Sequence, residues 1–145
     1  MATGEDLVES SSKLVLLVED DESVKELLEF MVKKEGFRCA TSADGEDALR
    51  QARSLKPDLI LLDLMLPRCG GFEVLRQLQE EDTAAIPVIV VTGRRTDQTT
   101  QEIIRQERNV KDFMEKPIKP SLLALSLHRV LKTKPPELGK VTGDF

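Results

Sequence analysis

Three acidic side chains stand at the ends of short apolar runs in this sequence. Glu19 and Asp20 directly follow Leu14–Val18, and Asp63 directly follows Leu59–Leu62. Carboxylates that gather in one place repel one another unless a cation joins them, and a set made only of oxygen ligands suits a hard divalent ion such as Mg²⁺. If the three acids meet in space, they predict a magnesium site.

A hydroxyl and an ammonium group stand at two further segment ends. Thr92 follows Val88–Val91, and Lys116 follows Lys111–Glu115. When a metal ion compensates its negative charge, a carboxylate can attack a phosphoryl group, while a hydroxyl and an ammonium hold the transferring oxygens. Together with the acids, this set indicates phosphoryl transfer, which depends on positioning and charge compensation.

The segments before these residues have the pattern of buried strands. The runs at 14–18, 59–62 and 88–91 are short and continuously apolar, as in strands covered on both faces. Phe37–Thr41 and Lys111–Glu115 are predicted to be two further strands. In an open parallel sheet, the loops at the carboxyl ends of the strands form the binding crevice, so the residues with useful chemistry are expected at one edge.

Helices are predicted between these strands. Val24, Leu27, Leu28 and Met31 recur at helical spacing as an inward-facing set, and Gly36 is well placed to end that helix in a left-handed conformation. Five strands alternating with five helices predict a doubly wound α/β domain, because right-handed connections place helices on both faces of a parallel sheet.

Length and composition fit one domain with short ends. The chain has 145 residues, of which 40% are hydrophobic and 32% charged, as in globular proteins. Residues 1–12 are predicted to form a flexible N-terminal extension, 13–132 the folded domain and 133–145 a C-terminal tail. Cys39 and Cys69 lack metal-ligand spacing and are predicted to be reduced thiols.

Charge and hydropathy restrict the expected partners and location. The formal net charge is -5 at pH 7, which opposes binding to a polyanion, so no direct contact with nucleic acid is predicted. No apolar run is long enough to span a bilayer, and the N-terminus does not have the pattern of a signal peptide. No membrane association and a cytoplasmic location are therefore predicted.

Four segments resemble the motifs of response-regulator receiver domains. They are Val18–Asp21, Leu62–Pro67 with Gly71, Val91–Gly93 and Glu115–Pro117. Each segment alone is a weak signal, but all four in order at strand or turn positions form a specific one. The resemblance covers roughly residues 13–132. It implies a flavodoxin-like, five-stranded parallel sheet of strand order 2-1-3-4-5, similar to the chemotaxis regulators.

The resemblance assigns a phospho-acceptor and a metal site. It implies that Asp63 accepts the phosphoryl group and that Asp20 and Asp63 bind Mg²⁺ directly. Glu19 would act through metal-bound water, and the carbonyl oxygen of Met65 would complete the protein ligands. Met65 and Arg94 also occupy positions where receiver domains vary the access of water to the acyl phosphate.

The resemblance further assigns a catalytic pair and a switch. Thr92 and Lys116 would contact the phosphoryl oxygens, and the Lys116–Pro117 peptide bond is expected to be cis. Thr92 and Phe113 would form the signalling switch. Because Phe113 stands where the family often has Tyr, no phenolic hydroxyl is available to the ring when it points outward.

These assignments imply a phosphorylation-dependent signalling switch and not an enzyme acting on a separate substrate. Asp63 would be phosphorylated by a sensor histidine kinase or a histidine phosphotransfer protein. The face formed by the fourth helix, fifth strand and fifth helix would then change its affinity for an effector protein. The chain is expected to be a monomer or a phosphorylation-dependent dimer. A stand-alone regulator, a phosphorelay carrier and a receiver from a longer protein all remain open.

Other functions fit the residues less well. A magnesium-dependent phosphohydrolase with an aspartyl-phosphate intermediate would have a second acid at position 65, where this chain has Met65. A nucleotide-binding domain would have a Gly-rich loop after the first strand, where Glu19 and Asp20 would repel phosphates.

Structural roles compete with some of these functional ones. Asp20 or Asp21 can cap the first helix, although three acids in one crevice favour a metal site. Phe113 can equally be a core residue. His128, near the end of the last helix, is predicted to lie on the surface without a phosphorelay role.

Overall fold

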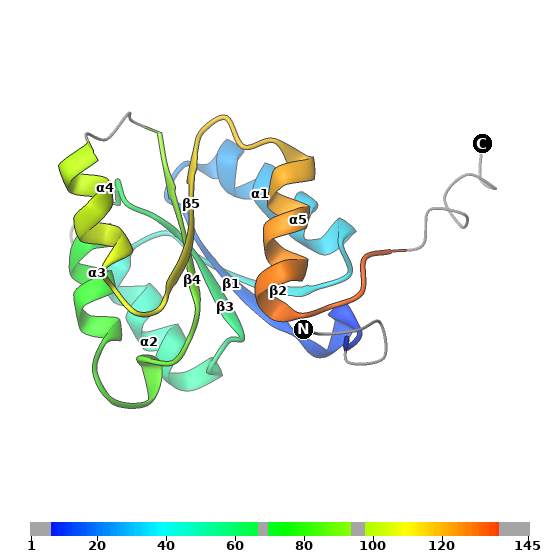
Figure 1. The fold of residues 1–145 in the computed structure, drawn as a ribbon, viewed down its shortest axis with the longest axis horizontal. Helices are drawn as coiled ribbons and strands as arrows, with labels where there is room; N and C mark the ends of the chain where they lie inside the picture. Colours follow the sequence, from blue (N-terminus) through cyan, green and yellow to red (C-terminus); the bar gives the residue numbers. More distant parts are fainter. Residues whose placement is uncertain (1–6, 67–69, 94–97, 137–145) are drawn as a thin grey trace.

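Continuously apolar runs form the three central strands of a parallel sheet in the computed structural model, which describes residues 7–66, 70–93 and 98–136. The sheet has five strands in the order β2-β1-β3-β4-β5 (Figure 1). The strands are β1 Leu14–Val18, β2 Arg38–Ser42, β3 Leu59–Asp63, β4 Val88–Thr92 and β5 Val110–Glu115. The predicted doubly wound α/β class and strand order are confirmed.

Helices cover both faces of the sheet, with α1 and α5 on one side and α2, α3 and α4 on the other (Figure 1). In the described part of the chain, the α-helices are α1 Glu22–Lys34, α2 Gly45–Leu55, α3 Gly71–Leu78, α4 Gln98–Arg105 and α5 Pro120–Leu131. Each layer has its own apolar core, because successive strand residues point to opposite faces. Two short 3-10 turns, Ser10–Ser12 and Glu81–Thr83, precede β1 and β4 in the chain.

The strand register brings the candidate site residues to one edge of the sheet. Val18 pairs with Leu62, and Asp63 pairs with Val91. Thr92 pairs with Glu115 on the neighbouring strand. Because all the strands are parallel, the residues that follow β1, β3, β4 and β5 emerge at the same edge.

Local capping fixes the ends of α1. The Asp21 carboxylate accepts the N–H of Val24 at 3.1 Å, so Asp21 is the N-cap and the two preceding acids are not used in capping. At the other end, Gly36 has φ 96°, which confirms the prediction of a left-handed residue there. The connection from β1 to α1 is therefore short, and the Asp21 side chain fixes the point where the helix begins.

Two sequence predictions about burial are wrong. Leu27 was expected to face inward, but its side chain is 54% exposed. His128 was expected on the surface, but it is buried, with Nδ1 2.7 Å from Thr133 Oγ1 and Nε2 2.8 Å from Glu35 Oε1. Its ring also packs on Phe37 with 5.1 Å between centroids. These contacts bury His128 where α5 meets the end of α1.

Parts of the two predicted end segments lie side by side in the structure. Val8 forms an isolated parallel bridge with Thr133, and the Ser10 hydroxyl donates to the carbonyl of Lys134 at 3.2 Å. Residues 1–6 and 137–145 are outside the described residues, so the domain limits 13 and 132 stay a prediction. No helix in the described ranges has the length and apolar character to cross a membrane.

Candidate functional site

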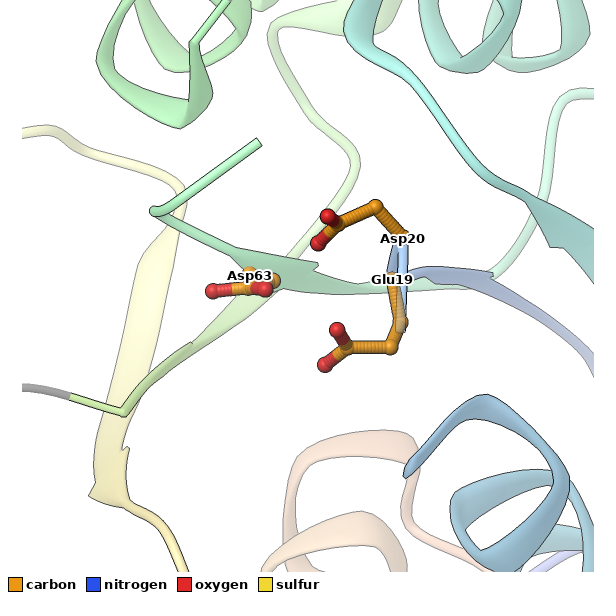
Figure 2. Close-up of side chains that lie close together, drawn as sticks. All are labelled: Glu19, Asp20 and Asp63. Carbon is orange, nitrogen blue, oxygen red and sulfur yellow. The ribbon is translucent and has the colours of Figure 1, made fainter. Parts of the chain in front are cut away.

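Three carboxylates from two neighbouring strands form the centre of the site. Glu19 and Asp20 follow β1, Asp63 is the last residue of β3, and one oxygen from each lies within 4.8 Å of the others. Figure 2 shows the three side chains close together at the ends of these strands. Asp20 is exposed, whereas Glu19 and Asp63 are 1% and 3% exposed. The predicted grouping of the three acids is therefore present.

Glu19 is a buried carboxylate whose two oxygens have different partners. Its Oε2 accepts the N–H of Asp21 at 3.1 Å. Its Oε1 forms an ion pair with Lys116, whose Nζ lies 2.6 Å away. Burial, together with the charge of Asp63, raises the pKa of Glu19 despite the lowering effect of Lys116 and Asp21.

Asp63 presents its carboxylate to both a backbone donor and a cation. Its Oδ1 accepts the N–H of Met65 at 3.0 Å. Its Oδ2 lies 3.4 Å from Lys116 Nζ. A nearly buried carboxylate held in this way has a fixed orientation, which a nucleophile requires.

Lys116 provides the positive charge that faces the acids. Burial lowers the pKa of its ammonium, but the contacts with Glu19 and Asp63 outweigh this effect, so the pKa is raised above its ordinary value. The backbone N–H of Lys116 donates to the backbone carbonyl of Thr92 at 2.8 Å. The Lys116–Pro117 peptide bond is cis, as predicted.

The predicted switch pair lies on one face of the sheet. Thr92 is fully buried at the end of β4. Phe113 pairs with Val90, two residues before Thr92, so the alternation of strand side chains directs Phe113 and Thr92 to the same face. Phe113 is partly buried and packs against the core beneath α4.

Gly71 lies against the backbone that carries the candidate phospho-acceptor. Its N–H donates to the carbonyl of Leu64 at 3.1 Å. A Cβ atom at position 71 would lie 2.7 Å from the carbonyl oxygen of Asp63 and would also overlap the backbone of Leu64. The backbone of Asp63 and Leu64 can therefore lie against the start of α3 only because residue 71 has no side chain.

The substitution Gly71→Ala is expected to destabilise the domain by about 1–3 kcal/mol, because backbone atoms must move to admit the methyl group. Urea denaturation followed by circular dichroism measures this change. Gly70→Ala is the matched control, since nothing lies within 4 Å of a Cβ atom at position 70. Equal stability of the two variants would contradict the close approach at Gly71.

The donor set fits a magnesium ion. The acids supply only oxygen ligands from three carboxylates that lie together, and Asp20 is open to solvent. Mg²⁺ prefers carboxylate oxygens and retains several waters, which an exposed ligand allows. The side chains that suit the ion are those of Glu19, Asp20 and Asp63.

The structure brings most of the predicted site residues to this edge and leaves two predicted positions undescribed. Thr92 and Lys116 follow the strands beside Asp63, in the order expected. Arg94 and Cys69 lie outside the described residues, whereas Cys39 is a free thiol, as predicted. The steric role of Gly71 was not predicted, although its place after the loop containing Pro67 was noted.

Comparison with known proteins adds independent findings. A family model described as the response regulator receiver domain matches residues 15–128. Transcriptional regulatory protein AfsQ1 of Streptomyces coelicolor is 37% identical over 118 residues, which are 81% of this chain and 51% of that protein. DNA-binding response regulator MtrA of Mycobacterium tuberculosis is also 37% identical over 118 residues, which are 81% of this chain and 50% of that protein.

Solved structures are similar in fold. The receiver domain of sensor histidine kinase PA1611 from Pseudomonas aeruginosa, with a magnesium ion coordinated in the active site cleft, has a TM-score of 0.75 and 28% identity. That match covers 83% of this chain and 98% of the other. Chemotaxis protein CheY4 from Vibrio cholerae has a TM-score of 0.73 and 27% identity, over 82% of this chain and 98% of the other.

The relatives correct one prediction about partners. The prediction that nucleic acid is not among the partners was wrong. MtrA is named a DNA-binding response regulator, and AfsQ1 is named a transcriptional regulatory protein. The present chain spans about half the length of these curated relatives. The net charge of a segment of that size does not determine what a longer protein binds.

Proposed function

Because the chain belongs to the response regulator receiver domain family of two-component signalling, we propose that it is a phosphorylation-dependent switch in which Asp63 accepts the phosphoryl group. One observation carries this proposal. Asp63 is a nearly buried carboxylate that lies beside a cation, Lys116, and two further acids, Glu19 and Asp20. Such an arrangement makes a carboxylate nucleophile available once its charge is compensated.

The phosphoryl donor would be a phosphohistidine on a histidine kinase or phosphotransfer protein. An oxygen of Asp63 forms a bond to phosphorus as the phosphorus–nitrogen bond breaks, and the electron pair leaves with the imidazole. Lys116 pairs with one phosphoryl oxygen, and the Thr92 hydroxyl donates to another. Both contacts stabilise the negative charge of the phosphoryl oxygens as this group is transferred to Asp63.

Asp20 and Asp63 would hold Mg²⁺ directly, Glu19 would hold it through water, and the carbonyl of Met65 would complete the set. The ion supplies the positive charge that a phosphoryl group needs in order to approach three carboxylates. The phosphohydrolase alternative has weaker support, because position 65 carries an uncharged side chain.

The output of the switch would be a change in protein binding at the face formed by α4, β5 and α5. A cavity of about 370 Å³ lies between β5 and α5, and Phe113 contributes to its lining. Leu122 and Leu125 on α5 border it and are 53% and 65% exposed. An exposed apolar surface beside an aromatic ring that changed position with phosphorylation would suit a partner that distinguishes two states.

Incubation with a small-molecule phosphodonor tests the proposal. The intact mass of the wild-type chain should increase by one phosphoryl group in the presence of Mg²⁺ and remain unchanged when the ion is removed by chelation. Beryllofluoride, a stable phosphoryl analogue, should also bind only when Mg²⁺ is present. Absence of both the adduct and beryllofluoride binding in the presence of Mg²⁺ would refute the phospho-acceptor role.

Mg²⁺ is expected to stabilise the folded chain, and the substitution Asp20→Asn should remove most of that effect. At a concentration roughly 100 times the dissociation constant, a ligand that binds only the folded state adds about 2.7 kcal/mol. Denaturation should be followed by circular dichroism at constant ionic strength, because the chain has no Trp or Tyr for intrinsic fluorescence.

A surface substitution provides the control for this experiment. Asp82→Asn changes the net charge by the same amount at an exposed position and should retain the full response to Mg²⁺. An equal response in Asp20→Asn and the wild type would show that Asp20 is not a ligand.

A further inference from the structure

The guanidinium of Arg105 lies over the ring of Phe113. The distance from Arg105 Cζ to the ring centroid is 5.9 Å, which is within the range of a cation–π contact. Arg105 is the last residue of α4, where a positive charge interacts favourably with the helix dipole. The preceding residue, Ile104, is 1% exposed and anchors this end of the helix in the core.

Phe113 lies between a packed region and an open one. Its side chain is partly buried and packs against the core cluster that contains Val90 and Ile104. The residue also lines the cavity between β5 and α5. A partly buried side chain in a residue that lines a cavity is less confined than a core side chain, so a small energy difference can decide which rotamer it adopts.

The backbone around Phe113 is held separately from its ring. The N–H of Phe113 donates to Asp112 Oδ1 at 2.8 Å, and Asp112 Oδ2 accepts the hydroxyl of Ser126 on α5 at 2.7 Å. Phe113 is also in register with Val90 on β4. Movement at this position is therefore expected in the side chain and not in the strand.

We propose that Arg105 holds the Phe113 ring in its resting position and thereby sets how readily the switch responds at Asp63. A phenyl ring has no hydroxyl with which to bond to a polar group, and the guanidinium provides a polar partner for its face instead. This inference rests on the proposed function for its link to Asp63. The position of the ring can nevertheless be measured without any phosphoryl group.

Loss of the cation should favour the state that binds the phosphoryl analogue. A partly exposed cation–π contact contributes about 0.5–1 kcal/mol, so Arg105→Gln should tighten Mg²⁺-dependent beryllofluoride binding by about two- to fivefold. Arg105→Lys keeps the cation and should lie close to the wild type. Arg105 acts here as a positioning residue, because its effect passes through Phe113.

The experiment uses the full chain with 4-fluorophenylalanine incorporated only at position 113. Its fluorine resonance reports the ring environment, and titration calorimetry of the unlabelled proteins gives the beryllofluoride affinity. Arg108→Gln is the matched control, because it removes the same charge from an exposed residue three positions further along the chain. In Arg105→Gln, the resonance should move toward the value that the wild type shows when beryllofluoride is bound.

The outcomes separate this inference from the proposed function. An unchanged resonance in Arg105→Gln, or an affinity equal to or weaker than that of the wild type, would overturn the role of Arg105. Equal shifts in the Arg105 and Arg108 variants would also overturn it, because they would indicate a general charge effect. Failure of the wild type to bind beryllofluoride with Mg²⁺ would instead refute the function proposed for Asp63, while the resonance would still test the Arg105–Phe113 contact.

Discussion

The substitution Asp63→Asn is expected to abolish phosphorylation of this chain completely. An amide oxygen is a poor nucleophile and carries no net charge, so the bond to phosphorus cannot form at position 63. The substitution keeps the size of the side chain and the acceptor for the N–H of Met65, which lies 3.0 Å away. The fold and the loop geometry should therefore remain, and the chemistry alone should disappear.

Intact-protein mass spectrometry after incubation with a phosphodonor and Mg²⁺ measures this loss. Asp82→Asn, at an exposed position that forms an ion pair with Lys56, should still acquire one phosphoryl group. A magnesium-dependent adduct of the same yield in Asp63→Asn would place the acceptor elsewhere. Peptide mapping of that adduct would then identify the modified side chain.

Sequence patterns predicted that three acids would meet because these residues stand at strand ends. An apolar run such as Leu59–Leu62 has no polar face, so the strand that it forms must be covered on both sides, as in a parallel sheet. Parallel strands end at the same edge of the sheet, so the residues that follow them lie near one another. This places Asp63 beside Glu19 and Asp20 without any knowledge of side-chain contacts. The prediction needed only the order of the strands and the position of each acid after its run.

Contacts between distant parts of the chain could not be predicted in this way. His128 is buried because Glu35, Phe37 and Thr133 surround it, and no local pattern indicates that neighbourhood. Leu27 belongs to a helical apolar set, yet the width of the face that α1 buries depends on how α5 packs beside it. The Arg105–Phe113 contact likewise depends on the placement of α4 on β5.

The substitution Lys116→Met is expected to lower the free energy of unfolding by about 2–4 kcal/mol at neutral pH without divalent cations. Removal of one partner of a buried ion pair costs roughly 3–5 kcal/mol, and the Lys116 side chain is still 21% exposed, which reduces the effect. Methionine keeps the length of the side chain, so the loss reports the charge. The nearly buried carboxylates of Glu19 and Asp63 would remain without the nearby ammonium.

The dependence on pH and Mg²⁺ distinguishes this explanation from a packing defect. The pKa of Glu19 is already raised and should rise further in Lys116→Met, so the folded variant holds this proton more tightly than its unfolded chain does. Its stability should therefore fall more steeply than that of the wild type as the pH rises from acid to neutral. The pKa of Lys116 is raised above 10.5. The contribution of its ammonium to the stability of the wild type should therefore be complete below that pH and lost as the pH rises further.

Mg²⁺ should restore more stability to Lys116→Met than it adds to the wild type, because the ion supplies the missing positive charge beside Glu19 and Asp63. Urea denaturation between acid and neutral pH, with and without Mg²⁺, measures both effects. Lys119→Met, at an exposed position three residues further along the chain, is the control. It should change neither the pH dependence nor the Mg²⁺ dependence of the free energy of unfolding. A loss in Lys116→Met that is the same at every pH and unaffected by Mg²⁺ would mean that Lys116 supports the fold through its alkyl chain, and its ammonium would then have no part in holding the acids together.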